Sequence, residues 1–427
     1  MIKNQIRLIS FLLVMVILTS CSSNNVANVE TTVLDTAIET TENKNLIEDE
    51  NVVDENTVAY GINTTADEIY DSILKMDTHM HVDVPMEILK AKDYENDDLR
   101  LRMKRAGYSA IGMTVAVDYV PLPYYGLAYK RFLNALDEYD DMLNKANLTR
   151  SLNADDVENN FAKGEPVVIQ CVEGAHFVEG DISRIKTAYD RGLRVFCLLH
   201  DNDADPALGD VYTNEPKYGG LTDLGADVIR ECERLGILVD LAHCDDETIK
   251  GALKVATKPI IITHTGLNTR LGTDEQMANM MYKRLISEET AKLVAENGGV
   301  IGLWPHLANS PKEYADNLDA MVKVVGIDNV CIGTDTKITK ELNEREIVIT
   351  EEMRKQFANQ GNEDNKRKMP VQNLDAKNHI WEDIDDNFYH SIIVELVNLG
   401  YNKEDIEKMA SGNFMRVFRE ATINSTF

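Results

Sequence analysis

Five of the nine histidines in this chain lie where a short apolar segment ends. Imidazole and carboxylate groups bind metal ions and transfer protons, so polar residues at these positions could carry out hydrolytic chemistry. One histidine at a strand end is more often structural than a ligand, but five at such ends favour a metal site. The side chains concerned are His79, His81, Glu173, His200, His243, His264 and Asp335.

His79 and His81 are separated by a single residue. Because side chains alternate between the two faces of a strand, these two histidines point the same way and can hold one metal ion. His176 follows shortly after Glu173 and is expected to lie behind the ligands rather than among them.

Short apolar segments alternate with amphipathic ones from Asp67 onward. Segments that are apolar throughout are typical of strands buried on both faces, and their alternation with helices predicts a parallel sheet. Eight repeats favour a (β/α)8 TIM-type barrel, with an open doubly wound sheet as the alternative. The predicted strands are Ile73–Val84, Ala110–Val117, Pro166–Val172, Arg194–Leu199, Gly236–Ala242, Pro259–Thr263, Gly299–Trp304 and Asn329–Gly333.

Three longer connections are expected to emerge at the C-terminal face of the barrel, where active sites are found. They are residues 118–165 (with a helix at Tyr129–Leu143), 201–220 and 337–386. Gly192 and Gly236 are predicted to end helices, and the segment from Ser310 to Glu313 is typical of a capping box.

The composition describes a globular but strongly acidic protein. Apolar residues make up 44% of the 427 residues, which is enough for a large core, and the formal net charge is −28. So negative a surface repels phosphate backbones, which makes nucleic acid an unexpected partner. Apart from Cys21, the five cysteines (Cys171, Cys197, Cys232, Cys244 and Cys331) are predicted to be buried, reduced thiols.

The N-terminus resembles that of a bacterial lipoprotein. Two basic residues precede a short apolar run that is too short to span a membrane, and Leu18-Thr19-Ser20-Cys21 resembles a lipobox. We therefore expect a signal peptide at 1–20, lipid on Cys21, a flexible acidic tether at 21–62 and a hydrolase barrel at 63–427. This predicts an extracytoplasmic, membrane-anchored protein.

Several motifs occur together along the barrel region. They are Asp77-Thr78-His79, Val172-Glu173-Gly174, Leu199-His200, the segment from Gly236 to His243, Ile262-Thr263-His264, the segment from Glu296 to Gly302, Gly333-Thr334-Asp335 and Gly412-Asn413-Phe414. The set resembles the membrane (renal) dipeptidase family of the amidohydrolase superfamily over about residues 67–421.

That resemblance implies a site with two zinc ions. One ion would be held by His79 and His81, the other by His243 and His264, and Glu173 would bridge both. Metal ions about 3.5–4 Å apart can share a hydroxide at neutral pH, and this hydroxide would attack the peptide carbonyl.

The resemblance also assigns two catalytic groups and one substrate-binding group. Asp335 would carry a proton toward the leaving amine, although a role as a metal ligand or structural acid stays open. His200 would bind the substrate carbonyl and stabilise its oxyanion. An arginine would bind the substrate's C-terminal carboxylate; Arg284 is preferred because of its downstream context, and Arg270 is the alternative.

One residue departs from the family pattern. The family has His-x-Asp in its first strand, whereas this chain has His79-Met80-His81. A neutral ligand in place of an anionic one makes the metal pair more electropositive, which could change the metal preference or the substrate.

The sequence thus predicts a dinuclear zinc dipeptidase that hydrolyses small peptides outside the cytoplasm. The alternative is a related amidohydrolase acting on another amide, an N-acyl amino acid or a lactone. A phosphoesterase or deoxyribonuclease sharing the His-x-His start fits less well because the chain is acidic and shows no basic groove. A lipoprotein that only binds its ligand fits less well because the candidate ligands and Asp335 are all present. A homodimer stays open.

Overall fold

The computed structural model describes residues 65–82, 99–119, 121–338 and 384–423, together with the backbones of strands at Leu89–Ala91 and Arg345–Ile347. The predicted signal peptide, Cys21 and the acidic tether lie outside this range, as does most of the connection at 337–386. None of the helices in the described ranges is long and apolar enough to cross a membrane.

Eight parallel strands form the centre of the fold, and they occupy the eight apolar segments identified in the sequence. Neighbours in the sheet follow chain order without a reversal, whereas a doubly wound sheet would reverse at a switch point. The strands are β1 (Met76–His81), β3 (Ala110–Ala116), β5 (Val167–Glu173), β6 (Leu193–Cys197), β7 (Leu238–Asp240), β8 (Ile261–Thr265), β9 (Val300–Leu303) and β10 (Val330–Ile332).

The last strand returns to the first. Just after β10, the chain forms β11 (Thr336–Lys337), which pairs with β1 in parallel, and the amide of Asp335 donates to the carbonyl of His79 at 3.0 Å. The barrel predicted from the sequence is therefore confirmed. Two further pairings lie off this ring: β4 (Thr149–Arg150) with β5, and β2 (Leu89–Ala91) with β12 (Arg345–Ile347).

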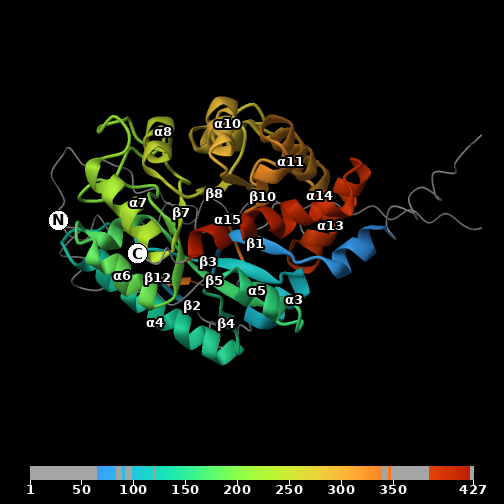
Figure 1. Cartoon of the computed structure of the whole chain (residues 1–427), viewed down its shortest axis with the longest axis horizontal. Coiled ribbons are helices and arrows are strands. Elements are labelled where there is room, and N and C mark those ends of the chain that lie inside the picture. Colours follow the sequence, from blue (N-terminus) through green and yellow to red (C-terminus); the bar gives the residue numbers. More distant parts are fainter. Residues whose placement is uncertain are drawn as a thin grey trace, which may run out of the picture. The chain divides into compact units, whose positions relative to one another are not determined.

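Helices surround the strands (Figure 1). Residues 65–72 are helical, and short 3-10 turns occur at Ala175–Val178, Tyr282–Arg284 and Ile327–Asn329, with a π turn at Lys408–Gly412. The α-helices are α3 (Leu99–Ala106), α4 (Leu127–Ala146), α5 (Ala154–Phe161), α6 (Ser183–Asp190), α7 (Asp223–Leu235), α8 (Asp246–Val255), α9 (Glu275–Met281), α10 (Glu288–Glu296), α11 (Pro311–Val325), α13 (Ile384–Asn398), α14 (Lys403–Glu407) and α15 (Asn413–Thr422).

The predicted helix ends are present. The Ser310 hydroxyl accepts from the Glu313 amide at 3.2 Å, while the Glu313 carboxylate accepts from the Asn309 amide at 2.6 Å, one residue before the cap. Gly236 follows α7 in the left-handed conformation at φ 81°, which glycine adopts without steric cost. Gly192 likewise comes just after α6.

The helix expected within 118–165 is α4, and it serves as the crossover helix between β3 and β5. Phe132 of α4 stacks on Phe177 with ring centroids 4.0 Å apart. Tyr139 of the same helix donates to the carbonyl of Thr114 on β3 at 2.7 Å. The connection at 201–220 leaves the C-terminal end of β6 as predicted, so it begins beside the polar strand ends.

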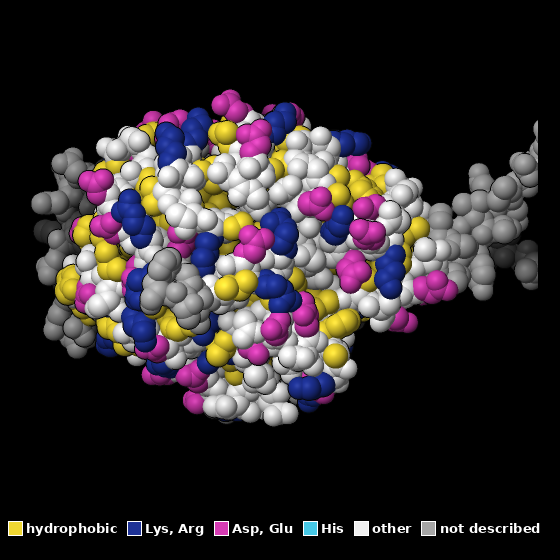
Figure 2. All heavy atoms as spheres, viewed as in Figure 1, with side chains coloured by type: hydrophobic (Ala, Val, Ile, Leu, Met, Phe, Trp, Pro, Cys, Tyr) yellow, Lys and Arg dark blue, Asp and Glu magenta, His cyan; other side chains and the backbone are white. Residues whose placement is uncertain are grey.

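The opposite end of the barrel is filled by α15. Phe414 and Phe418 are fully buried against apolar residues at the strand starts, including Met76 and Val167. All five cysteines of the barrel region are buried and free, as predicted. On the face seen in Figure 2, Lys and Arg side chains are interspersed with Asp and Glu rather than gathered into one basic patch.

Gly225, in the first turn of α7, lets the loop at Leu208 approach the helix closely. A Cβ atom at this position would lie 2.0 Å from the Leu208 carbonyl oxygen. We expect Gly225→Ala to destabilise the protein by about 1–3 kcal/mol, the usual effect of overpacking. Thermal unfolding of the purified barrel measures it.

Gly412→Ala is the matched control. Gly412 is also helical, but its added Cβ would meet nothing closer than 3.4 Å, so alanine there should be neutral or stabilising by up to about 1 kcal/mol. Equal melting temperatures for the two variants would show that the loop at Leu208 moves freely away from α7.

Candidate metal centre and active site

Glu173, the last residue of β5, lies at the centre of the histidine cluster. Its carboxylate is buried, and histidines from the ends of β1, β6, β7 and β8 face it. The Nε2 atoms around Oε1 belong to His243 (2.8 Å), His79 (3.4 Å) and His264 (3.6 Å), and those around Oε2 belong to His200 (3.4 Å) and His81 (3.5 Å). All five predicted strand-end histidines are thus brought together.

Asp335 lies on the open side of this cluster. One of its oxygens is 3.1 Å from His81 Nε2, and the other is 3.5 Å from the Nε2 of His306. Its backbone is left-handed at φ 52°, as is that of His243 at φ 66°. Residues other than glycine rarely adopt this conformation, and such strain persists where surrounding contacts impose it, often at functional sites.

The donor set fits a metal centre. His79 Nε2 and Glu173 Oε2 are buried yet have no hydrogen-bond partner within the described part of the chain. A buried polar atom without a partner is costly, and a metal ion would satisfy both. The ligand atoms that lie within 4.8 Å of one another form two groups, His79–Glu173–His264–Asp335 and Glu173–His200–His243.

Glu173 is common to both groups, as a bridging carboxylate should be. The groups nevertheless cut across the predicted pairs, since His264 lies with His79 and His200 lies with His243. Asp335 belongs to the first group, which supports the ligand role that the sequence left open for it.

A hydroxyl behind the cluster sets the orientation of two rings. Thr263 Oγ1 donates to Asp240 at 2.6 Å, so it can only accept from His264 Nδ1 at 3.0 Å and His79 Nδ1 at 3.3 Å. With their Nδ1 protons turned to Thr263, both rings present Nε2 to the cluster. Asp77 also holds the backbone at this point, because its carboxylate accepts from the backbone amide of His79 at 3.0 Å.

The charges of the cluster depend on one another. Burial raises the pKa of Glu173, but His200 and His79 outweigh it and hold that pKa well below its ordinary value. Burial lowers the pKa of His79, yet Glu173 and then Asp335 raise it to about 9. At neutral pH a metal ion must therefore displace the proton on His79 Nε2 in order to bind there.

Behind His200 lies a second polar group, which the sequence analysis did not assign. His200 Nδ1 is 2.5 Å from Asp118, whose other oxygen accepts from the side chain of Asn202 at 2.9 Å. His176 lies behind the cluster as expected, with Nε2 3.0 Å from the carbonyl of Asn202. Burial lowers the pKa of His200, but Asp118 and Glu173 raise it well above its ordinary value.

Gly174 makes this arrangement possible. Its backbone is left-handed at φ 80°, and a Cβ atom there would lie 2.7 Å from His176 Nδ1 and 2.8 Å from His200 Cβ. Only glycine therefore lets the chain turn directly after Glu173.

The two candidate arginines lie in different surroundings. Arg284 is half-buried and forms an ion pair with Asp201, whose other oxygen is 3.3 Å from His243 Nδ1. Arg270 is exposed and donates to Asn317 at 3.1 Å. The structure thus links Arg284, and not Arg270, to the histidine cluster.

Trp304 and His306 were not assigned to the site from the sequence, but both lie beside it. The Trp304 ring packs against His264 and His306, with ring centroids 5.8 Å and 5.2 Å away. The sequence did contain a signal for both residues, because an aromatic residue and a histidine follow shortly after β9, the seventh barrel strand.

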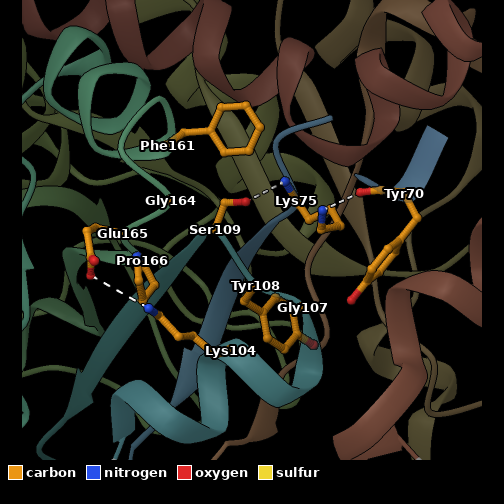
Figure 3. Close-up of a pocket in the computed structure, with 10 residues that line it drawn as sticks. All are labelled: Tyr70, Lys75, Lys104, Gly107, Tyr108, Ser109, Phe161, Gly164, Glu165 and Pro166. Atoms are coloured by element: carbon orange, nitrogen blue, oxygen red, sulfur yellow. Dashed lines mark hydrogen bonds and ion pairs between the residues drawn. The ribbon is translucent and has the colours of Figure 1, made fainter. Parts of the chain in front are cut away.

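A cavity of about 230 Å³ lies elsewhere (Figure 3). It is lined by residues at the starts of β1, β3 and β5, among them Lys75, Ser109 and Pro166. The Lys75 ammonium group donates to the carbonyls of Tyr70 at 2.5 Å and Ile73 at 3.1 Å. This cavity is at the N-terminal end of the barrel, away from the histidines, where residues usually serve stability.

Histidines and carboxylates gathered at the C-terminal ends of barrel strands define a metal-dependent hydrolase. A family model described as membrane dipeptidase (peptidase family M19) matches residues 64–363. This range covers most of the chain, and it includes all the histidines and carboxylates of the cluster, from His79 to Asp335. The protein therefore belongs to the membrane dipeptidase family, and it is a metal-dependent hydrolase of the dipeptidase class.

Solved structures share the fold. The probable dipeptidase PvdM from Pseudomonas aeruginosa has a TM-score of 0.64 at 17% identity, covering 86% of this chain and 100% of that one. An amidohydrolase from the same organism has a TM-score of 0.62 at 16% identity, covering 84% and 99%. A metallopeptidase from Rhodobacter sphaeroides, solved with a phosphinate mimic of the dipeptide L-Ala-D-Ala, has a TM-score of 0.54 at 15% identity, covering 82% and 99%.

His81 is the residue that departs from the family pattern, and its contacts with Glu173 and Asp335 make its role testable. If His81 is a ligand, His81→Ala should lower the affinity of one metal site about ten-fold or more, because a coordination position is lost. His81→Asp, which restores the family residue, should keep both sites. Chelator competition followed by elemental analysis measures this.

His390→Ala is the matched control, since His390 also contacts an aspartate, Asp67 at 2.7 Å, but on the surface. Metal content and activity that are the same in His81→Ala and wild type would show that His81 is only a packed strand residue.

Proposed function

We propose that the protein is a dinuclear zinc dipeptidase that hydrolyses small peptides outside the cytoplasm. The observation that carries this proposal is the position of Glu173, a buried carboxylate with histidine nitrogens around each of its two oxygens. A carboxylate in this position can bridge two metal ions. His79 and His81 would complete one site, with Asp335 beside them, and His243 and His264 the other. Because the ligand atoms of His79 and His264 lie within 4.8 Å of one another, these two histidines would stand at the boundary between the two sites.

Zinc, when bound, would polarise the scissile carbonyl and lower the pKa of a water molecule enough to supply a nucleophile at neutral pH. The remaining tasks fall to the protein's own side chains. His200 Nε2 faces the cluster, where it would donate to the carbonyl oxygen of the substrate as negative charge develops there. Asp335, on the open side, would pass a proton to the leaving amine or, as the alternative, bind the metal ion beside His79.

Arg284 would bind the substrate's C-terminal carboxylate. It is the candidate arginine joined to the cluster through Asp201, and a guanidinium group can bind a carboxylate through two parallel hydrogen bonds. The Rhodobacter sphaeroides metallopeptidase is liganded with a mimic of a dipeptide, which supports a dipeptide as the substrate class here.

A second candidate is supported by the same ion pair. Arg284 already has a carboxylate partner in Asp201, so part of its charge is neutralised before any substrate binds. A substrate without a free carboxylate, such as another small amide or a lactone, would not have to compete with Asp201. This candidate is a related amidohydrolase activity.

The metal count is the first test. Protein purified without chelators should contain close to two metal ions per chain, and Glu173→Ala should lose most of both, because both sites share this carboxylate. Elemental analysis gives the count. Glu165→Ala is a suitable control, since Glu165 is a partly exposed acid, away from the histidines, that pairs with Arg100 and Lys104. A fully active wild type with one ion in excess zinc would remove the bridging role of Glu173.

The substrate carboxylate is the second test. A dipeptide should be cleaved about ten to a hundred times better than its C-terminal amide, since a charge-assisted pair is worth about 1.5–3 kcal/mol. Arg284→Ala should abolish this preference, and Arg270→Ala should keep it. Values of kcat/KM for both substrates decide the matter: equal cleavage of acid and amide by the wild type favours the second candidate.

The location is the third test, and it depends on the sequence alone because Cys21 lies outside the described residues. The native protein should fractionate with membranes, since two acyl chains bind durably at about 0.8 kcal/mol per buried methylene. Cys21→Ala should prevent lipid attachment. Mass spectrometry of the mature N-terminus provides the check, and an unlipidated wild-type protein that begins elsewhere would reject the anchor.

A further inference from the structure

Asp118 has no part in the proposed reaction, yet it is one of the most tightly held carboxylates of the site. It follows β3 by two residues and is buried. One carboxylate oxygen lies 2.5 Å from His200 Nδ1, and the other accepts from the Asn202 side chain at 2.9 Å. Both oxygens of Asp118 therefore have hydrogen-bond partners.

The two ring nitrogens of His200 have different surroundings. Nδ1 faces Asp118, while Nε2 lies 3.4 Å from Glu173 Oε2, on the metal side of the ring. A carboxylate can only accept, so a hydrogen bond at 2.5 Å places a proton on Nδ1. If the ring were turned over, a ring carbon would face Asp118 and this hydrogen bond would be lost. The bond therefore selects one of the two ring orientations.

Asp118 is itself fixed from several sides. The Asn202 amide donates to it, and His176 Nε2 lies 3.7 Å from the same carboxylate oxygen while contacting the Asn202 carbonyl at 3.0 Å. These neighbours come from the segments that follow β5 and β6, so Asp118 is held by the strand ends on its side of the barrel.

We propose that Asp118 is a positioning residue, which holds the His200 ring so that Nε2 faces the substrate carbonyl. The orientation of the ring does not depend on the substrate. The catalytic consequence does rest on the proposed function, because that function gives His200 the task of donating to the oxyanion. Carboxylates behind histidines commonly set ring orientation in this way.

The ring orientation can be tested without any substrate. In protein labelled with 15N-histidine, the short bond to Asp118 should give a low-field Nδ1 proton resonance, assigned to His200 by its loss in His200→Ala. Asp118→Ala should lose the same resonance. Asp67→Ala, which removes the acid partner of the surface residue His390, should keep it. A resonance that persists in Asp118→Ala would overturn the proposal.

Kinetics on a dipeptide tests the consequence. Asp118→Ala should lower kcat about ten-fold or more with little change in KM, because the oxyanion develops only in the transition state. Metal content and melting temperature should stay near wild type in the isosteric variant Asp118→Asn. Asp118→Asn retains an acceptor oxygen, so its kcat should lie between those of Asp118→Ala and wild type. Equal losses of kcat in Asp118→Asn and Asp118→Ala would reject positioning through a hydrogen bond that this side chain accepts.

A double variant separates this role from others. In the His200→Ala background, Asp118→Ala should cause no further loss of kcat, since it acts through a ring that is already absent. A further loss would show that Asp118 acts on another group. If wild type cleaves no dipeptide, the proposed function fails, while the proton resonance still decides whether Asp118 orients His200.

Discussion

A carboxylate buried at the mouth of the barrel governs the arrangement of the other polar residues. Glu173 is nearly inaccessible, and an isolated charge there would be strongly destabilising, so histidines from four other strands must compensate it. That compensation depends on register. Glu173 is level with Ala116 of β3 and Cys197 of β6, which brings Asp118 and His200, shortly after them, together on one side. A slip of one residue in either pairing would move these side chains away from each other and from Glu173.

Much of this could be predicted from the sequence. A strand buried on both faces is apolar throughout, so the eight strands could be located, and their polar ends stood out as candidates. The residues behind the histidines could not be paired in this way. Asp118 and His200 are 82 positions apart and are joined only by the barrel. Choosing between Arg284 and Arg270 likewise required the contact with Asp201.

The polar oxygens behind the histidines follow one pattern. Asp118 lies behind His200, the Tyr212 hydroxyl lies 2.7 Å from His243 Nδ1, and Asp240 acts on His264 through Thr263. In each case an oxygen faces Nδ1, so Nε2 is left to face Glu173. A histidine alone offers two nitrogens and two ring orientations, and these contacts favour one of them. The sequence showed which side chains could bind a metal, whereas the oxygens behind them determine which nitrogen would do so.

Two departures from the expected site have opposite electrostatic effects. His81 replaces an anionic residue of the family pattern, which makes a bound metal pair more electropositive and strengthens its attraction for an anionic substrate. Asp201 pairs with Arg284 and so weakens the attraction of that arginine for a carboxylate. With metal ions bound, the positive field would thus be shifted from the arginine toward them. A substrate would then be held more by its scissile group and less by its terminal carboxylate than the family pattern alone implies.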